Sequence, residues 1–234
     1  DELKPYQSPY TVVANINGDP TTRMAFAWLT NDRMLEGQVQ LTPVTDITSL
    51  STAFDAAEDV ITVTATSTAT KKIRYAIGLS GIPTATGLSQ STKYKYTSHK
   101  AIADNLTPNT IYAYRVGTDG YWSEVAYFTT APKNEEDASE EFTFIYMTDS
   151  HILDQGYIDD VRQTATAAVT NVPDAKFCVF AGDHVETGGS GNPEWEWERW
   201  FEEAMRPIVQ QMPIVPTDGN HDDSENLNYS YHFH

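Results

Sequence analysis

The stretch PIVPTDGNHDDSEN, from Pro213 to Asn226, changes from apolar residues to a cluster of polar and charged ones. As a plain surface turn, Asp218-Gly219-Asn220 would be ordinary, because Gly and Asn tolerate the backbone angles that tight turns need. A turn does not explain why the imidazole of His221 and the carboxylate of Asp222 crowd the same place. Other places where Asp, His and Asn gather are needed to decide between a turn and a functional strand end.

Two further apolar segments end in the same way. Residues 142–148, FTFIYMT, are typical of a buried strand and are followed by Asp149-Ser150-His151. Residues 176–181, KFCVFA, are followed by Gly182-Asp183-His184. The three apolar segments therefore have the same pattern, in which a short predicted strand is followed directly by polar side chains.

Helical periodicity separates these strands, at residues 158–169 and again at residues 193–209, where Pro193 suits the first turn of a helix. Strands alternating with helices predict a parallel sheet, in which functional residues gather just beyond the carboxyl ends of the strands. Asp and Asn also begin helices, so capping is the alternative explanation for each cluster. Three clusters at one predicted edge favour a metal site.

The residue types suit this chemistry. Carboxylate, imidazole and amide oxygen together form a ligand set appropriate to Mn, Fe or Zn. A carboxylate has two oxygens and can bridge two ions about 3.5–4 Å apart, the spacing used in two-metal hydrolysis. A nearby imidazole outside the ligand set can stabilise a developing charge or protonate a leaving oxygen.

The first 131 residues predict a β-sandwich, because short segments rich in β-branched and aromatic residues alternate with turn clusters. An acidic stretch, residues 132–141, follows and indicates a linker before a second domain at residues 142–234. Residues 51–60 are compatible with either a helical turn or a loop. The expected strands are Thr11–Ile16, Met24–Leu29, Gln38–Leu41, Val60–Ala65, Ile73–Ile77 and Tyr112–Val116.

The end of this region is more specific. Leu106, Pro108, Thr110 and Tyr112 have the spacing of a tyrosine corner, in which the Tyr hydroxyl bonds back to the preceding loop. With the residues that follow up to Pro132, this stretch resembles the end of a fibronectin type III-like sandwich, in particular the N-terminal domain of purple acid phosphatases. The resemblance supports the expectation of a sandwich.

The three strand-end clusters together resemble the first motifs of the calcineurin-like metallophosphoesterases. The resemblance implies a β-sandwich followed by an α/β region with part of that family's α/β/β/α layers, and hydrolysis of phosphate esters by a dinuclear metal centre that activates water. The expected cofactors are two Fe, Mn or Zn ions. The resemblance implies the following roles: Asp149 and His151 ligate the first ion, Asp183 bridges both, Asn220 ligates the second, and His221 faces the phosphate with Asp222 as its partner.

Two departures from these families matter. Purple acid phosphatases place a Tyr three residues after the Asp of the second motif, whereas this position is Glu186 here, so we expect no Tyr-bound ferric ion. The family also has later motifs that supply further histidines, but the sequence stops at His234. We therefore expect only the N-terminal half of the catalytic domain, with an incomplete set of ligands. An extracellular adhesion protein with a degenerate metallophosphoesterase scaffold is the alternative.

The composition of the chain limits the kinds of binding partner and the location that we expect for it. The formal net charge is −18, from 15 basic and 33 acidic residues, so we expect no nucleic-acid-binding surface. No apolar run approaches the roughly 18 residues that a membrane span needs. Cys178 is the single cysteine and is expected to be buried and unreactive. Similarity to secreted phosphatases favours an extracellular or cell-envelope location.

Two further groups are open to more than one interpretation. His184 follows Asp183 and could approach the site, but a solvated histidine at a strand end is favoured. Trp195, Trp197 and Trp200 could form a sugar-stacking face, but burial of an amphipathic helix explains at least Trp197 and Trp200 more simply.

Overall fold

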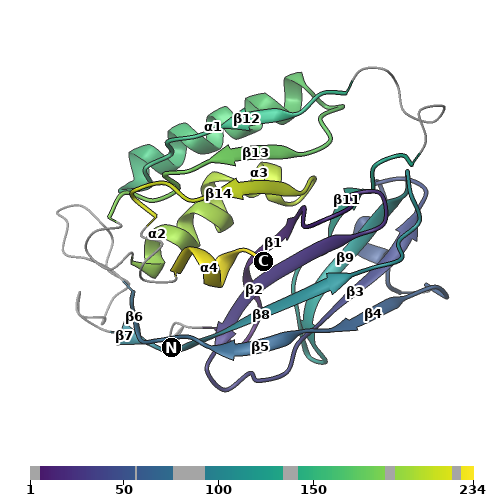
Figure 1. Cartoon of the computed structure of the whole chain (residues 1–234), viewed down its shortest axis with the longest axis horizontal. Helices are drawn as coiled ribbons and strands as arrows, with labels where there is room; N and C mark the ends of the chain where they lie inside the picture. Colours follow the sequence, from purple (N-terminus) through teal and green to yellow (C-terminus); the bar gives the residue numbers. More distant parts are fainter. Residues whose placement is uncertain (1–5, 56, 76–92, 134–141, 188–192, 223–227) are drawn as a thin grey trace.

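The computed structural model describes residues 6–55, 57–75, 93–133, 142–187, 193–222 and 228–234. The N-terminal region is built from strands packed as a sandwich, and the C-terminal region alternates strands with helices (Figure 1). The N-terminal elements are β1 (Tyr10–Asn15), β2 (Met24–Asn31), β3 (Gln38–Val44), η1 (Leu50–Thr52), β4 (Ile61–Thr64), β5 (Thr66–Ala69), β6 (Ile73–Arg74), β7 (Lys93–Tyr94), β8 (Tyr96–Ala103), β9 (Ile111–Thr118), β10 (Tyr121–Trp122) and β11 (Ala126–Thr129). The C-terminal elements are β12 (Ile145–Met147), α1 (Gln155–Asn171), β13 (Cys178–Ala181), α2 (Glu194–Arg199), the π-helix η3 (Trp200–Ala204), α3 (Arg206–Val209), β14 (Ile214–Thr217) and α4 (Asn228–His232).

One sheet runs through both regions. Its seven strands have the order β12-β13-β14-β1-β2-β8-β5, and a second sheet has the order β10-β9-β3-β4 with β11 beside β9. Strands β12, β13 and β14 are parallel neighbours, as expected from the sequence. The junction is the parallel pair β14 and β1, where Asn15 lies opposite Ile214 and the Ile16 N–H donates to the Ile214 carbonyl at 3.1 Å.

A helical layer covers one face of this sheet. The core between the sheet and the helices contains Trp197 together with side chains from the strands, namely Val13, Cys178, Phe180 and Ile214. Trp197 and Trp200 are both 0% exposed, so their predicted burial is confirmed, and Trp195 is buried with them at 3% exposed. Cys178 is buried as predicted, and burial raises the pKa of its thiol to about 12.

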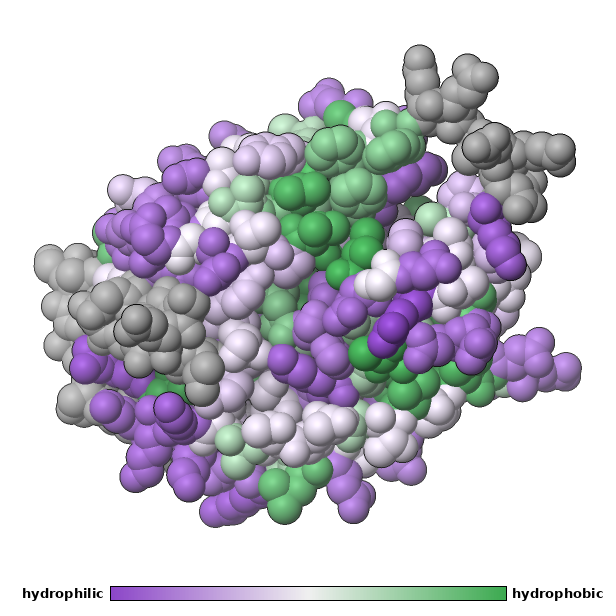
Figure 2. Space-filling model, viewed as in Figure 1, coloured by the Kyte–Doolittle hydropathy of each residue, from purple (hydrophilic) through white to green (hydrophobic). Residues whose placement is uncertain are grey.

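The opposite face is covered unevenly. Under β1 and β2 it packs on the second sheet through residues such as Phe26 and Trp28, both 0% exposed. Over β12 and its flank it is open, and Phe144 and Tyr146 are 43% and 63% exposed. Figure 2 shows apolar side chains gathered over this part of the molecule. The strand predicted at residues 142–148 is present as β12, but the prediction that it is buried is wrong, because β12 lies at the edge of the sheet with one face uncovered among the described residues.

Local sequence signals account for several elements. Asp154 begins α1, since its Oδ1 accepts the N–H groups of Gly156 and Tyr157 at 2.8 and 3.3 Å. The tyrosine corner is confirmed, because the Thr107 N–H donates to the Tyr112 hydroxyl at 2.9 Å. Of the stretch expected to be a helical turn or a loop, residues 51 and 52 belong to the 3-10 helix η1 and residues 53–55 form a turn. The strand expected from Val60 begins one residue later, as β4.

Other expectations need adjustment. Strands β5, β7, β8, β10 and β11 were not among the expected strands, although β8 is eight residues long and pairs with β2 and β5 in the seven-stranded sheet. The helical stretch at residues 193–209 is divided into three short helices, with η3 between α2 and α3. Residues 134–141 of the expected linker lie outside the described residues. No helix in the described part of the chain is long and apolar enough to cross a membrane.

Candidate metal centre

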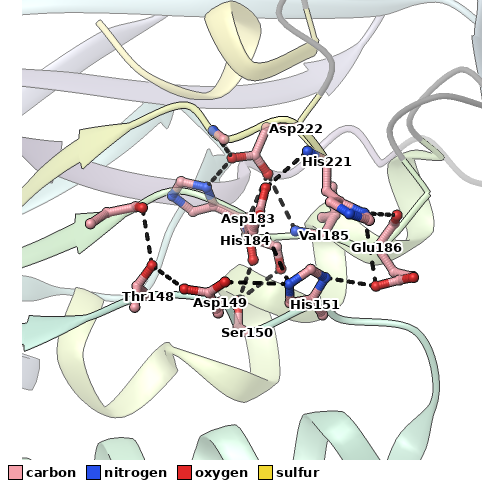
Figure 3. Close-up of polar contacts among 12 residues, drawn as sticks. Thr148, Asp149, Ser150, His151, Asp183, His184, Val185, Glu186, His221 and Asp222 are labelled. Carbon is pink, nitrogen blue, oxygen red and sulfur yellow. Dashed lines mark hydrogen bonds and ion pairs between the residues drawn. The ribbon is translucent and has the colours of Figure 1, made fainter.

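The candidate ligands follow three neighbouring strands at one edge of the sheet. Met147 pairs with Phe180, and Ala181 pairs with Thr217, so β12, β13 and β14 end side by side. Asp149 follows β12, Asp183 follows β13 and His221 follows β14, and the three segments face one another (Figure 3). The sheet register therefore brings together residues that lie far apart in the sequence.

Asp149, His151 and Asp183 form the closest set. One ligand atom from each lies within 4.8 Å of the others. His151 Nε2 is 3.6 Å from Asp149 Oδ1 and 3.7 Å from Asp183 Oδ2. The Asp149 side chain is 62% exposed and that of Asp183 only 15%, so the set is open to solvent on one side and held by the protein on the other.

The backbone is strained at these same residues. Asp149, His151 and Asp183 have φ angles of 56°, 43° and 53°, in the left-handed region that non-glycine residues rarely adopt. The Asp149 N–H donates to the Gly182 carbonyl and the His151 N–H to the Asp183 carbonyl, each at 3.1 Å. Residues held in unfavourable conformations cluster at functional sites.

Close backbone contact brings β13 and β14 together at the site. A Cβ on Gly219 would lie 2.2 Å from Asp183 Oδ1, and a Cβ on Gly182 would lie 2.9 Å from Gly219 Cα. Neither position has room for a side chain. The glycine in the quoted stretch therefore lets the third segment approach the carboxylate of Asp183.

His221 lies against the candidate ligands. Its N–H donates to Asp183 Oδ1 at 2.9 Å, and its Nδ1 donates to the Glu186 carbonyl at 2.6 Å. Its ring meets that of His151 edge to face, with centroids 4.6 Å apart. The hydrogen bond to the Glu186 carbonyl, assisted by the carboxylates of Asp183 and Glu186, raises the pKa of His221.

Asp222 and His184 form a buried pair beneath the site. Both side chains are fully buried, and His184 Nδ1 donates to Asp222 Oδ2 at 2.8 Å. The other oxygen, Asp222 Oδ1, accepts the His184 N–H at 2.8 Å, and the Gly219 N–H donates to Oδ2 at 2.9 Å. The interpretation of His184 as a solvated histidine is wrong, because Asp222 gives the imidazole a partner inside the core.

Burial and hydrogen bonding together set the charges of this pair. Burial lowers the pKa of His184 and keeps its ring neutral. Burial opposes ionisation of Asp222, but hydrogen bonds from His184 and from the Gly219 and Val185 N–H groups outweigh it and hold the pKa of Asp222 below its usual value. A neutral imidazole and an ionised carboxylate thus tie β13 to the turn after β14.

The remaining predicted ligand, Asn220, lies in the same turn as His221 and is exposed. Glu186, which stands where purple acid phosphatases have a Tyr, is a contributor that the sequence motifs did not predict. Glu186 Oε2 accepts from His151 Nδ1 at 2.7 Å and lies 3.9 Å from His221 Nδ1. His151, Glu186 and His221 form a second set with ligand atoms within 4.8 Å of one another. The position of Glu186, three residues after Asp183, was the available signal.

The donor set fits a metal centre. Carboxylate and imidazole groups converge from separate strands, with a solvent-exposed side where an ion and its water ligands could enter. Such oxygen and nitrogen donors suit divalent first-row ions. The strained backbone at Asp149, His151 and Asp183 is a second and independent indication, since simple helix caps do not need left-handed residues.

Comparisons with known proteins agree with this description. The family model of the purple acid phosphatase N-terminal domain matches residues 9–130, and the model of the calcineurin-like phosphoesterases matches residues 142–234. No curated protein sequence matches the chain.

Two solved structures are similar in fold. Purple acid phosphatase PPD1 from yellow lupin (Lupinus luteus) seeds has a TM-score of 0.60 at 14% identity, and the match covers 92% of this chain and 36% of that one. PhoD has a TM-score of 0.52 at 15% identity, and the match covers 94% of this chain and 40% of that one. The chain thus spans well under half the length of either protein. It belongs to the family that carries a purple acid phosphatase N-terminal domain, here followed by a calcineurin-like phosphoesterase region.

Proposed function

We propose that this protein hydrolyses phosphate esters at a dinuclear metal centre. The observation that carries the proposal is the meeting of Asp149, His151 and Asp183, with ligand atoms within 4.8 Å of one another. The match of residues 142–234 to the calcineurin-like phosphoesterases supports the reaction class and gives no support to the adhesion alternative.

The proposed roles follow from position. Asp149 and His151 hold the first ion, and Asp183, which has an oxygen near each histidine segment, bridges to the second. Asn220 supplies an amide oxygen to the second ion from the turn after β14. Bound ions supply Lewis-acid polarisation of a phosphoryl oxygen and a nucleophile derived from water. Fe, Mn and Zn are the candidates.

His221 is the proposed contact to the phosphate. Its Nδ1 hydrogen is engaged by the Glu186 carbonyl at 2.6 Å, so Nε2 is the nitrogen left for a substrate oxygen. Its side chain is 33% exposed, which leaves it accessible from the open side of the site. Asp222 supports His221 from beneath the site. Its carboxylate accepts a hydrogen bond from the Gly219 N–H and so holds the turn that carries His221.

The experiment compares the wild-type chain with Asp183→Asn. Metal content is measured by elemental analysis, and hydrolysis is assayed with p-nitrophenyl phosphate and bis(p-nitrophenyl) phosphate in the presence of Mn²⁺, Zn²⁺ or Fe²⁺. We expect the variant to lose metal and about 100-fold or more in rate, since the ions stabilise the transition state by several kcal/mol. Asp119→Asn, at an exposed turn of the sandwich, is the matched control and should change nothing. Equal rates in wild type and Asp183→Asn would refute the proposal.

Two broader proposals accompany it. The chain divides into a sandwich at residues 1–131 and a catalytic region at residues 142–234, a division supported by the separate ranges of the two matching family models. The extracellular or cell-envelope location stays a prediction, which fractionation of the native source would check.

A further inference from the structure

Glu186 contacts both histidines of the candidate centre, by different atoms. Its carboxylate accepts from His151 Nδ1 at 2.7 Å, and its main-chain carbonyl accepts from His221 Nδ1 at 2.6 Å. A carbonyl oxygen, like an ionised carboxylate, can only accept a hydrogen bond. Both imidazoles must therefore carry a hydrogen on Nδ1, which leaves Nε2 as the nitrogen available to the site.

The geometry at His151 agrees with this assignment. Nε2 of His151 lies 3.6 Å from Asp149 Oδ1 and 3.7 Å from Asp183 Oδ2, among the oxygens proposed to hold an ion. Nδ1 points the opposite way, to Glu186 (Figure 3). The His151 ring thus lies between the Glu186 carboxylate, which is bonded to Nδ1, and the carboxylates of Asp149 and Asp183, which lie near Nε2.

The segment that carries Glu186 is itself anchored from inside the protein. The N–H groups of Glu186 and Thr187 both donate to Glu196 Oε2 at 3.1 Å, and the Thr187 hydroxyl donates to the other oxygen of Glu196. Glu196 lies on α2 and is 0% exposed. A buried side chain on a helix therefore fixes the position of the two acceptors that Glu186 offers.

From these contacts we infer that Glu186 is a positioning residue of the centre: its carboxylate fixes His151 in the Nδ1–H form, with Nε2 directed at the ion. The inference rests on the proposed function. It differs from direct ligation by Glu186, which the second set of ligand atoms would also permit. Carboxylates that hold metal-binding histidines in this way typically contribute 10–100-fold to metal affinity.

Three variants separate the possibilities. Glu186→Gln keeps an acceptor for His151 Nδ1 but removes the charge, and Glu186→Leu removes the acceptor while keeping the bulk. Glu58→Leu, at an exposed position of the sandwich, is the control. The Glu186 side chain is 34% exposed, so neither substitution leaves a large cavity, and circular dichroism checks folding.

The first measurement needs no metal. Nitrogen-15 NMR of the imidazoles at about pH 8, where an ordinary histidine is neutral, reports which nitrogen carries the hydrogen. We expect the Nδ1–H form of His151 in wild type, in Glu186→Gln and in the control, and a shift toward the Nε2–H form in Glu186→Leu. An unchanged tautomer in Glu186→Leu would overturn the inference.

The second measurement is Mn²⁺ affinity by calorimetry. We expect Glu186→Leu to bind about 10–100-fold more weakly than wild type and Glu186→Gln to stay within a few-fold. Equal losses in both variants would overturn positioning in favour of direct ligation. If wild type binds no metal, the proposed function fails, while the tautomer measurement still decides whether Glu186 orients His151.

Discussion

The two halves of the seven-stranded sheet are covered differently. Strands β1, β2 and β8 have packed layers on both faces, so that Phe26 and Trp28 are 0% exposed. Strands β12, β13 and β14 have helices on one face, and Phe144 and Tyr146 on the other are 43% and 63% exposed. The candidate ligands all follow strands of the second half.

Within this one sheet, one half therefore contributes mainly to the stability of the fold and the other half carries the candidate metal centre. The doubly covered half contributes buried apolar area, and its left-handed residues, such as Thr11 in β1 and Asn105 after β8, are not part of the candidate site. The singly covered half contributes less burial, but its strand ends hold strained polar residues close together. Substitutions in the two halves should therefore change different measured quantities.

The largest expected effect comes from matched phenylalanines. Phe26→Ala should lower the free energy of unfolding by about 3–5 kcal/mol, the cost of removing a fully buried Phe. Phe144→Ala should lower it by less than about 1 kcal/mol, because its ring is already 43% exposed. Urea unfolding followed by tryptophan fluorescence measures both. Similar losses would break the comparison, since they would mean that the open face is buried in solution.

A second prediction concerns pH and Glu196. Burial raises the pKa of Glu196 from 4.5 to about 7, so the folded chain keeps this proton over a pH range where the unfolded chain has lost it. Its contribution is fully present below about pH 4.5 and is lost as pH rises to about 7, a change of at most about 3 kcal/mol. Urea unfolding between about pH 4.5 and pH 7 measures the effect, and the free energy of unfolding of Glu196→Gln should not show this loss as pH rises.

His99 provides the opposite sign in the doubly covered half. Burial lowers the pKa of His99 from 6.5 to about 4, so its contribution is present above about pH 6.5 and is lost as pH falls toward 4. Over nearly the same pH range, His99→Gln should therefore remove a loss of stability that occurs as pH falls, whereas Glu196→Gln should remove a loss that occurs as pH rises. Profiles of the same sign for both variants would contradict the assignment.

A third prediction uses two glycines. Gly219→Ala places a Cβ 2.2 Å from Asp183 Oδ1, so the carboxylate must move, and we expect Mn²⁺ affinity to fall about 10–100-fold. Gly120→Ala, in a sandwich turn with φ of +85° and open space around it, should cost about 1 kcal/mol of stability and leave metal affinity unchanged. Calorimetry and urea unfolding distinguish them. Unaltered binding in Gly219→Ala would argue that Asp183 is not a ligand.

The smallest effect is expected at the tyrosine corner. Tyr112→Phe removes the acceptor of the Thr107 N–H and should lower the free energy of unfolding by about 1 kcal/mol. Tyr127→Phe removes only a long 3.4 Å contact to Gln211 and should cost less. Neither should alter metal affinity. A change in metal binding for Tyr112→Phe would show that the second sheet and the candidate metal centre are coupled more tightly than their packing indicates.

Asp149, His151 and Asp183 could be predicted from the sequence because parallel strands bring their carboxyl ends to one edge, and strand and helix periods are visible locally. The pairing of β14 with β1 could not be predicted, because nothing local marks which distant strand will lie alongside an edge. The prediction that β12 is buried is wrong, since an apolar run does not say how many faces of a strand will be covered.

The supporting residues were missed for a related reason. His184 is buried because the carboxylate of Asp222 comes from the turn after another strand, and local sequence cannot show that partner. Glu186 and His151 lie in segments that follow two different strands, and their side chains meet only in the folded protein. Glu196, on helix α2, accepts a hydrogen bond from the Glu186 N–H. Hydrogen bonds between side chains of different elements depend on the folded arrangement, whereas ligand types at strand ends can be seen in advance.

The junction between β1 and β14 also bears on how the chain is made. Asn15, at the end of β1, exchanges hydrogen bonds with His234, 219 residues later, as Asn15 Nδ2 donates to the His234 carbonyl at 2.9 Å. At about 5–20 residues per second, a ribosome needs roughly 10–40 s to synthesise the chain between them. During that interval β1 can pair with β2, but its other edge presents free N–H and C=O groups to any extended segment nearby. The nascent sandwich is therefore exposed to mispairing on this edge until β14 emerges and pairs with β1.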